Sequence, residues 1–518
     1  MSVGVRIAAP IRKWHIELLR RLAELQPDRV FALDPGPPDD STSRHRAEDL
    51  VRIDRLLGGR GSGLGRRCPP ESIRPWRLSQ PAAEAGPDLV LDLTAQPPAP
   101  QASLGSRTWT LRFDGDPGEA AALQALRAGR SPVVSIVDAH GTVVADGVPG
   151  SENPGVLSEA FDDLLAGCIV LIIGAVGSRQ FSTPAYQDEP IGGSTSTTSS
   201  PAPNDAAREL VRHAVRRGSS AALHRAYRAL YRAPHWRVGW RWTDGPGLIQ
   251  ETGEPSNGWQ ELPDDGRHFY ADPFPFEQDG RHYLFVEDFD HRVGRGVIAM
   301  TEFDDHGPIH PPIPVLSHDV HLSYPFVFAH DDEVWMIPET SAAGTIELYR
   351  ATGFPHQWKR EQILLDQVTG SDATVFRHQG RWWMTATVQH GGSFSDALHL
   401  WYADELTGPW TAHRHNPVLV DISSARPAGR VVIQDGRMMR PTQDGRKGYG
   451  ASLTITEIVA LDEDRFEQRL VRRLGPGPWW PGRRLHTLNR AGRLECIDGS
   501  AVSPRIPVPG HGTGRYVR

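Results

Sequence analysis

The chain has 518 residues, a length that favours two to four domains, and its 39% hydrophobic and 23% charged residues are ordinary for a soluble globular protein. A formal net charge of −7 argues against nucleic acid as a partner, because nucleic acid attracts basic surfaces. Three widely separated cysteines, Cys68, Cys168 and Cys496, exclude a disulfide framework and a thiolate zinc site, and they fit a reducing compartment.

The N-terminal stretch MSVGVRIAAPIRKWHIELL has no uninterrupted apolar segment before a cleavage site, so it predicts no signal peptide. The longest apolar run, LLAGCIVLIIGAVG at 164–177, is shorter than the roughly 20 residues of a membrane-spanning helix, which favours a buried helix or strand. We therefore expect a cytoplasmic protein. No motif for a cofactor or a metal stands out, and we expect neither.

Residues 1–180 alternate between strand-like and helix-like segments, which predicts an α/β domain. VGVRIAA reads as a first strand, and the next segment places Trp14, Leu18, Leu22 and Leu25 near one helical face. Further strands are PDRVFALD, PDLVLDLTA, TWTLRFDG and a hairpin in SPVVSIVDAHGTVVADG. The glycine run at 58–65 has neither a preceding apolar strand nor a following GK[ST], so we interpret it as a loop without a phosphate-binding role.

This N-terminal half faintly resembles the α/β domain of folate-dependent formyltransferases. The family's HxSLLPxxRG catalytic stretch is absent, so no catalytic residue can be carried over to this chain. The resemblance implies a degenerate formyltransferase-like domain that binds or scaffolds.

Residues 181–204 are rich in Ser, Thr, Gly and Pro, which predicts a flexible linker. Residues 205–234 predict a basic helical segment with a break at Gly218, and seven arginines fall within it. Such a helix can lie on an anionic membrane surface, which would make the protein membrane-peripheral. The alternative is a linker helix whose apolar stripe packs on a neighbouring domain, since any surface helix is amphipathic.

Residues 235–505 contain five copies of one layout, a strand, a polar tip and a second strand. The copies are ADPFPFEQDGRHYLFVED, SYPFVFAHDDEVWMIPET, SDATVFRHQGRWWMTATV, ARPAGRVVIQDGRMMRPTQD and LHTLNRAGRLECIDG. The copies are 52, 48, 54 and 60 residues apart, with further strand-like runs between them. About four strands per unit at this period predict a five-bladed β-propeller, followed by a tail at 506–518.

One position at the start of each copy should face the propeller axis. These positions are Asp272, Tyr324, Asp372, Arg426 and His486, and they should converge at one end of the axis. Fifteen residues later, Glu287 and Glu339 occupy matching places in blades 1 and 2, with Thr387 in blade 3. Unlike charges at innermost positions indicate a functional site, since unpaired buried charge is costly. The alternative is a structural polar network, or a bound ion, that fills the channel.

The pattern resembles the propeller of arabinanase- and β-xylosidase-type glycosidases. That resemblance implies that Asp272 is a general base, Asp372 a pKa modulator and His486 an axial histidine. Blade 4 carries Arg426 where those enzymes have a glutamic acid, and a guanidinium cannot donate the proton that glycoside hydrolysis needs. The hydrolytic machinery then requires Glu287 or Glu339 as a replacement acid.

A second resemblance is closer. YADPF, HLSYPFVF, MIPET, SDATVF, RWW, ARPAGR, RPTQD and LHTLN resemble, in order, the N-terminal propeller of glucosamine inositolphosphorylceramide transferases. In those transferases a separate glycosyltransferase domain is thought to carry the transfer, so this resemblance assigns no residue role by itself. Our candidate catalytic residues are Asp272, Asp372, Glu287 and Glu339. Our candidate substrate-binding residues are Arg426, His486, Tyr324, Asp444 and Trp383, with Arg426 holding a phosphate or carboxylate.

Three functions stay open at this point. The first is a glycosyl-transferring enzyme in glycoconjugate, glycolipid or secondary-metabolite assembly, with a carbohydrate or glycolipid substrate and an activated sugar donor. The second is a glycoside hydrolase of the same fold. The third is a non-catalytic carbohydrate-binding scaffold. Transfer from an activated donor, release of free sugar, and binding without turnover respectively distinguish them.

Overall fold

The computed structural model describes residues 1–26, 29–33, 42–76, 87–94, 107–177, 203–251, 258–480 and 482–506. They group into two compact units. The first comprises Met1–Ala221 with His390–Ala397 and Pro417–Ile422, and the second comprises Ala222–Gln389, Leu398–Asn416 and Ser423–Arg518. Residues 181–202 of the predicted linker and 507–518 of the predicted tail lie outside the described residues.

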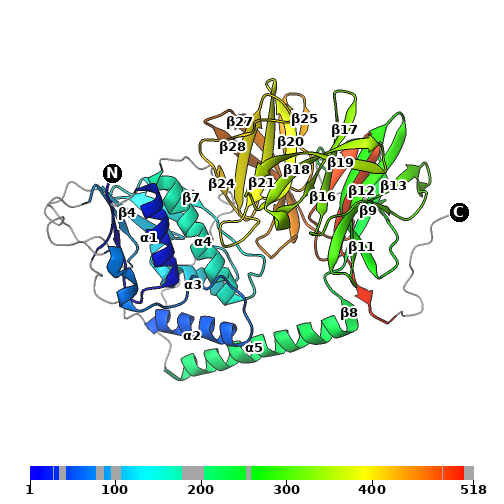
Figure 1. The fold of residues 1–518 in the computed structure, drawn as a ribbon. Coiled ribbons are helices and arrows are strands. Elements are labelled where there is room, and N and C mark those ends of the chain that lie inside the picture. Colours follow the sequence, from blue (N-terminus) through cyan, green and yellow to red (C-terminus); the bar gives the residue numbers. More distant parts are fainter. Residues whose placement is uncertain are drawn as a thin grey trace. The chain divides into compact units, whose positions relative to one another are not determined.

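The first unit, whose strands β4 and β7 are labelled in Figure 1, is built on a mixed sheet. The strand order of this sheet is β2-β1-β3-β4-β6-β7. Its first four strands run parallel, and β6 and β7 form an antiparallel hairpin, as the sequence predicts. The strands are β1 (Val3–Arg6), β2 (Val30–Leu33), β3 (Leu89–Asp92), β4 (Arg107–Phe113), β5 (Asp116–Pro117), β6 (Val134–Asp138) and β7 (Val143–Gly147). The helices are α1 (Lys13–Leu25), α2 (Thr42–Leu56), η1 (Pro70–Trp76), α3 (Glu119–Arg127) and α4 (Leu157–Val176).

Helix α4 is the centre of this unit's core. It contains the apolar run at 164–177, and most of its side chains are buried around its whole circumference, as expected of a helix without a polar face. Helix α1 buries Trp14, Leu18 and Leu22, whereas Leu25 at its last turn is 41% exposed. Leu25 is therefore the one predicted member of the buried face that lies outside the core, because the helix ends at this residue.

Two short segments from the C-terminal half of the chain complete this unit. One contains β24 (Leu419–Val420), where the Val148 amide donates to the Val420 carbonyl at 2.8 Å and the Ile422 amide donates to the Val148 carbonyl at 2.9 Å. In the other, Asp396 accepts a hydrogen bond from the Gly150 amide at 3.0 Å.

Helix α5 (Pro203–Leu230) runs without interruption through Gly218, so the predicted break at this glycine is wrong. A single interior glycine costs a helix only about 1 kcal/mol relative to alanine, and the helix-forming residues around it compensate. Within the first unit, His213 and Arg217 of α5 each contact the buried carboxylate of Asp54 at 2.9 Å. Among the helices of the described residues, none is both long enough and apolar enough to cross a membrane.

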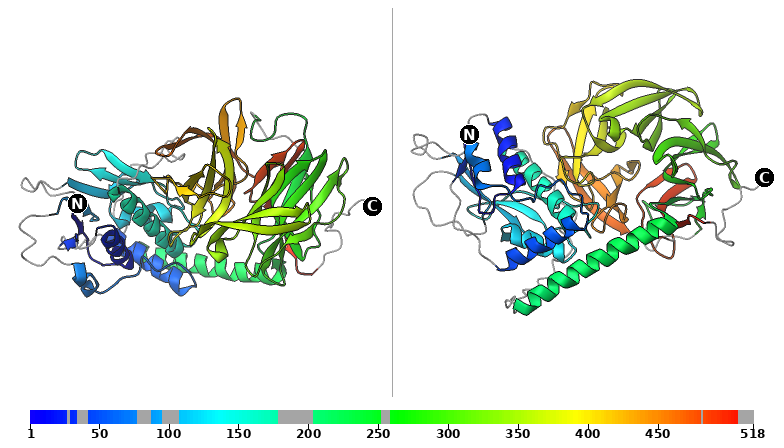
Figure 2. Two further views of the ribbon diagram at one scale, coloured as in Figure 1. Left: turned by 45° about the horizontal axis from the view of Figure 1, so that its top comes forward. Right: turned by 60° about the horizontal axis from the view of Figure 1, so that its bottom comes forward.

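The second unit is a five-bladed β-propeller, as predicted, with its blades arranged in a ring (Figure 2). Blade 1 consists of β11 (His268–Gln278), β12 (Arg281–Asp290), β13 (Arg295–Asp304), β14 (Gly307–Pro308) and β15 (Ile313–Leu316). Blade 2 consists of β16 (Ser323–His330), β17 (Glu333–Glu339), β18 (Thr345–Gly353) and β19 (Gln357–Asp366). Blade 3 consists of β20 (Gly370–His378), β21 (Arg381–Val388), β22 (Ala397–Ala403) and β23 (Thr411–Ala412). Blade 4 consists of β25 (Val432–Gln434), β26 (Arg437–Asp444), β27 (Ser452–Leu461) and β28 (Phe466–Leu474).

Blade 5 closes the ring with strands from both ends of the repeat region. Its inner strands are β29 (Leu488–Ala491) and β30 (Leu494–Ser500), and its outer strands are β9 (Trp236–Trp242) and β10 (Gln260–Glu261). A second pairing, of β8 (Tyr231–Arg232) with β31 (Ser503–Pro504), joins the same two chain regions. Because strands from both ends of the repeat region share one sheet, their backbone hydrogen bonds hold the ring of blades closed.

The polar tips that reveal the repeat are tight hairpin turns. In blades 1 to 4 both central tip residues adopt positive φ: Asp279 and Gly280, Asp331 and Asp332, Gln379 and Gly380, Asp435 and Gly436. This is the conformation of a type I′ turn, whose twist matches that of the flanking strands. Asp and Gly recur at the tips because they tolerate this backbone region.

Candidate functional site

The starts of the first three blades share an unusual backbone conformation. Asp272, Tyr324 and Asp372 have φ values of 49°, 45° and 57°, and each lies at a break in the strand register. A non-glycine residue at positive φ costs on the order of 1–3 kcal/mol, and a β-bulge redirects the side chain that follows. The same strained geometry thus places one side chain from each of three blades at the inner end of its strand.

Hydrogen bonds between blades connect these positions. The Tyr324 amide donates to Asp272 Oδ2 at 3.2 Å, and the Asp372 amide donates to Glu339 Oε2 at 3.2 Å. The Asp272 amide donates to Asp498 Oδ2 at 3.0 Å. The starts of blades 1 to 3 are therefore each held by a carboxylate of the preceding blade in the ring, which brings these predicted residues to one end of the axis. We call this set the axial cluster: Asp272, Glu287, Glu339, Asp372, Arg426, Gln443, His486 and Asp498.

Around Asp272, blade 5 supplies the partners. Thr487 Oγ1 donates to Asp272 Oδ1 at 2.8 Å, and His486 Nε2 lies 3.9 Å from the same oxygen. The other ring nitrogen of His486 is 2.6 Å from Asp498 Oδ2, and Trp236 stacks on the ring with centroids 4.0 Å apart. The carboxyl of Asp272 is buried, which raises its pKa to about 6 against the opposing effect of His486.

The charge state of His486 follows from the same contacts. Burial lowers the pKa of its imidazole, but the neighbouring carboxylates of Asp498, Asp272 and Asp372 together raise it by more, and the net shift is upward. Donor atoms of Asp272, His486 and Asp498 all lie within 4.8 Å of one another, so these three residues could hold a metal ion. Their direct contacts already supply opposite charge, which gives the trio a structural explanation without an ion.

Around Asp372, blade 4 supplies the partners. Arg426 donates to both Asp372 oxygens, from Nε at 2.6 Å and from Nη2 at 3.3 Å, and its Nη2 lies 3.7 Å from Glu339. Gln443 Nε2 donates to Asp372 Oδ2 at 3.1 Å. Burial nevertheless raises the pKa of Asp372 to about 7, against the effect of Arg426. Arg426 is thus a two-point partner of Asp372, which limits its availability to a bound anion.

Glu287 is a buried carboxyl that lies beside a partly exposed histidine. Its Oε1 lies 3.3 Å from Nε2 of His321, a ring that is 39% exposed. The Gly296 amide donates to Nδ1 of His321, so in the neutral ring the proton is on Nε2 and faces Glu287. Burial, and then the nearby charge of Asp272, raise the pKa of Glu287 well above its usual range. Burial and the nearby negative charge therefore favour the protonated form of the Glu287 carboxyl.

The cluster as a whole contains more carboxyls than cations. Five carboxyl groups, those of Asp272, Glu287, Glu339, Asp372 and Asp498, face one guanidinium and one imidazole. Burial makes full ionisation of all five unfavourable, so protons are retained into the neutral range. Such a site can both accept and donate protons near pH 7.

The second strand of each blade's hairpin also ends with a polar residue at the axis, and the sequence predicts only some of these residues. The repeat predicts Glu287, Glu339 and Thr387 at these ends, and the structure adds Gln443 and Asp498. A fixed offset of fifteen fails in the last two blades, where Gln443 is 17 residues after Arg426 and Asp498 is 12 residues after His486. The hairpin lengths differ, and only strand pairing reveals the equivalence.

Two predicted binding residues have other partners. Asp444 is buried and forms an ion pair with Arg446, with Nη2 and Oδ2 separated by 2.7 Å. Trp383 lies midway along β21 opposite Phe376, and its ring contacts Tyr402 at a centroid distance of 5.5 Å. No contact among the described residues links either side chain to Asp272 or Asp372. His321 and Trp236 take part in the site without a sequence signal beyond their aromatic type.

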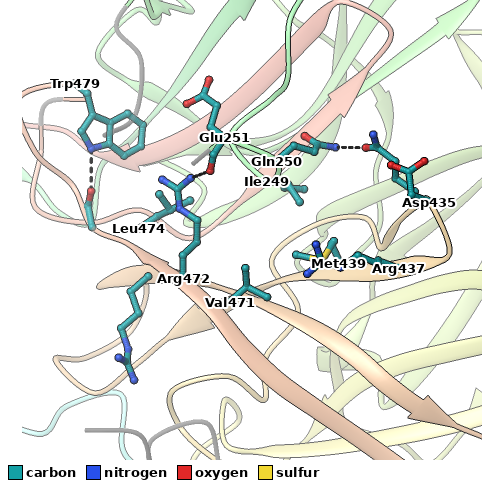
Figure 3. Close-up of a pocket in the computed structure, with 13 residues that line it drawn as sticks. Ile249, Gln250, Glu251, Asp435, Arg437, Met439, Val471, Arg472, Leu474 and Trp479 are labelled. Atoms are coloured by element: carbon teal, nitrogen blue, oxygen red, sulfur yellow. Dashed lines mark hydrogen bonds between the residues drawn. The ribbon is translucent and has the colours of Figure 1, made fainter. Parts of the chain in front are cut away.

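A separate cavity of about 690 Å³ lies at the far end of blade 4, near the tip of its first hairpin (Figure 3). Its lining is Ile249, Gln250, Glu251, Gln434, Asp435, Arg437, Met439, Val471, Arg472, Arg473, Leu474, Gly475 and Trp479. None of these residues belongs to the axial cluster. Gln250 Nε2 donates to the side chain of Gln434 at 3.2 Å across this cavity. The 690 Å³ cavity and the carboxyls that could transfer protons therefore lie at different places in the propeller.

Comparison with known proteins concerns this same region. Residues 262–493 match the family model described as "Glucosamine inositolphosphorylceramide transferase 1, N-terminal". The propeller resembles the N-terminal domain of these transferases. Glucosamine inositolphosphorylceramide transferase 1 of Oryza sativa subsp. japonica is 33% identical over 268 residues, covering 49% of this chain and 34% of the relative. The Arabidopsis thaliana protein of the same name is 30% identical over 251 residues, covering 46% and 33%. The chain spans about a third of the length of these curated relatives.

Solved structures with a similar fold include two glycoside hydrolases. A thermostable family-43 enzyme is 14% identical with a TM-score of 0.32, covering 42% of this chain and 78% of its own. Zg3597, a family-117 enzyme of Zobellia galactanivorans, is 13% identical with a TM-score of 0.33, covering 54% and 96%.

Proposed function

We propose that the propeller is a glycosyl-transferring domain in glycoconjugate, glycolipid or secondary-metabolite assembly, with its reaction centre at the axial cluster. The observation that carries the proposal is the set of buried carboxyls whose pKa values are raised toward neutrality at one end of the axis. The similarity of residues 262–493 to transferases named for a glycolipid product supports a carbohydrate or glycolipid as substrate.

Asp272 is the base in this proposal. Thr487 and the Tyr324 amide hold one oxygen each, which fixes the orientation of the carboxylate. The acceptor hydroxyl transfers its proton to Asp272 while its oxygen bonds to the anomeric carbon of an activated donor. The bond from that carbon to the leaving oxygen breaks at the same time.

Glu287 is the acid, since burial and the nearby charge of Asp272 favour its protonated form and it lies beside the partly exposed ring of His321. It protonates the leaving oxygen. Arg426 positions Asp372 through its two hydrogen bonds, and a role in holding a donor phosphate requires that this ion pair open.

Hydrolysis is the second candidate, and the raised pKa of Glu287 favours it specifically. This residue supplies the carboxylic acid that blade 4 lacks because it carries Arg426. If water took the place of the acceptor hydroxyl, the same acid and base would release free sugar.

The test uses the full chain with two substrate sets, nucleotide sugars with glycolipid acceptors and p-nitrophenyl glycosides alone. Glu287→Gln keeps the shape of the neutral acid but cannot donate a carboxyl proton, so turnover should fall by roughly 10²–10⁴-fold. Arg437→Ala, in the 690 Å³ cavity, is the matched control and should retain full turnover. Product with an activated donor supports transfer, and free sugar supports hydrolysis. Sugar binding with no turnover of either set would contradict both.

The pH dependence is a second reading from the same assay. Because Asp272 must be ionised to accept a proton and its pKa is about 6, turnover should fall tenfold per unit on the acid side of pH 6. Activity that is flat down to pH 4 would remove Asp272 from the role of base.

We also propose a cytoplasmic, membrane-peripheral location, in which helix α5 contacts an anionic surface. It presents exposed Arg208, Arg212, Arg216, Arg225 and Arg228 together with exposed apolar Val211, Val215, Leu223 and Leu230. Sedimentation with vesicles that contain phosphatidylserine should retain the protein at low salt, and neutral vesicles should not. Equal sedimentation with both vesicle types would contradict the proposal.

A further inference from the structure

The first unit contains a cavity whose lining is strongly basic. Its volume is about 280 Å³, and it lies between the start of α1, helix α2, the glycine-rich loop, α3 and α4. Its lining residues are Arg12, Glu48, Val51, Arg52, Arg55, Gly65, Arg66, Arg67, Leu123 and Phe161. Five arginines thus face one acidic side chain. We call this site the arginine cavity.

Arg12 forms the buried floor of the arginine cavity. Its guanidinium donates to Glu119 at 2.6 Å, to Glu48 at 2.5 Å and to the Gly65 carbonyl at 2.8 Å, and it lies over the Phe161 ring at 5.6 Å. Glu48 also forms an ion pair with Arg67. The only acidic residue in the lining is therefore engaged by two arginines, which leaves it little capacity to neutralise the others.

The glycine-rich loop has its own internal ligand. The amides of Gly63 and Gly65 donate to the two oxygens of Asp162 at 2.7 and 2.8 Å, and Arg55 donates to Asp162 at 2.8 Å. The first amides of α1 are likewise satisfied, by the carbonyls of Leu64 and Arg66. The positive character of the cavity therefore comes from side chains, and neither the loop nor the helix end is free to bind an anion.

Two arginines of the lining lack a strong partner. Within the described part of the chain, Arg66 forms no ion pair or side-chain hydrogen bond. Arg52 meets only Asp49, at 3.9 Å, and both of these side chains are largely exposed, so this pair contributes little. Two guanidinium groups with unused N–H donors thus border a cavity whose remaining charges are already paired.

We propose that the arginine cavity binds a small molecule through a phosphate group, with Arg66 and Arg52 as its ligands. A phosphate accepts hydrogen bonds from several guanidinium groups at once and carries up to two negative charges, which matches two unpaired arginines better than a single carboxylate does. The volume lies just below the roughly 300–1,000 Å³ of ordinary ligand pockets, so it admits a phosphate with a small organic group. The apolar wall of Val51, Leu123 and Phe161 suits such a group.

The test is calorimetric titration of the full chain at low ionic strength with inorganic phosphate, glycerol 3-phosphate and succinate. Both phosphates should bind, and Arg52→Ala with Arg66→Ala should weaken that binding by at least about tenfold. Arg107→Ala is the matched control, because Arg107 is an exposed arginine on β4 of the same unit that does not line the cavity. Arg52 and Arg66 are exposed, so the thermal midpoint of the double variant should match that of the wild type.

Three outcomes would overturn the assignment. The first is that no phosphate binds up to about 10 mM, a concentration at which even millimolar affinity is visible. The second is that the double variant binds phosphate as tightly as the wild type. The third is that succinate binds more tightly than either phosphate. The result is independent of the axial cluster, so loss of glycosyl transfer in the Glu287 variant leaves this proposal standing.

Discussion

The axial cluster of the propeller and the arginine cavity of the first unit are charged sites of opposite sign that manage their excess charge differently. At the axis, four buried carboxyls and the partly buried Glu339 lie with one arginine, and the excess negative charge is reduced by protonation, as the raised pKa values of Asp272 and Glu287 show. In the arginine cavity, the buried Arg12 is paired with carboxylates, and the unpaired Arg66 remains exposed. A carboxyl can become neutral near pH 7, whereas a guanidinium cannot.

This contrast predicts very different costs for removing one arginine from each site. Arg426→Met leaves Asp372 buried without its two-point partner, so the propeller should lose about 3–5 kcal/mol of unfolding free energy at neutral pH. Arg66→Ala should change stability by less than about 0.5 kcal/mol, because the side chain is exposed and has no described partner. Urea unfolding followed by tryptophan fluorescence measures both values.

Lower pH gives the control for the Arg426 prediction. Protonation of Asp372, whose pKa is about 7 in the native protein, removes the unpaired charge, so the destabilisation by Arg426→Met should shrink between pH 8 and pH 5. Asp372→Leu combined with Arg426→Met should recover much of the loss, because it removes both members of the buried pair. Equal stability of Arg426→Met and wild type at pH 8 would show that the pair contributes nothing and that Arg426 is available to a ligand.

The propeller is the part of the fold that the sequence predicts best, because its signals are local and repeated. Type I′ tips such as Asp279–Gly280 recur in blades 1 to 4, and a short strand, a polar tip and a second strand recur in all five, so blade number follows from counting. The outer strands of blade 5 could not be predicted from a local repeat, since β9 pairs with β30, which lies more than 200 residues later in the chain. The continuity of α5 through Gly218 was missed because helix propensity at one residue is a weak signal.

The axial cluster was predictable only where it follows the repeat register. Asp272, Asp372, Arg426 and His486 share one place in their blades and do converge, whereas Asp498 and Gln443 are displaced by differing hairpin lengths. The pairing of Arg426 with Asp372 depends on side-chain direction across two blades, which no spacing encodes. The arginine cavity had no sequence signal either, because its lining comes from five segments between Arg12 and Phe161.

The smallest expected effect is that of substituting Thr387, and it tests whether the axial end of blade 3 contacts a ligand or only fills the channel. Thr387 Oγ1 is buried at the second-strand end of blade 3 and has no hydrogen-bond partner among the described residues, as is also true of Gln443 Oε1 in blade 4. A buried hydroxyl without a partner destabilises the native state, so Thr387→Val, which keeps the shape of the side chain, should raise the unfolding free energy by about 0.5–1 kcal/mol. If the hydroxyl faces a bound sugar, the same variant should weaken sugar binding by roughly tenfold, since a sugar hydroxyl would lose its partner.

Thr385→Val is the matched control on the same strand, because Thr385 already donates to the Thr374 carbonyl and its substitution should lower the stability of the protein. Urea unfolding and calorimetric sugar titration of the two variants measure both effects. A more stable Thr387→Val protein with unchanged sugar binding would mean that the axial end of blade 3 fills the channel and does not contact the ligand.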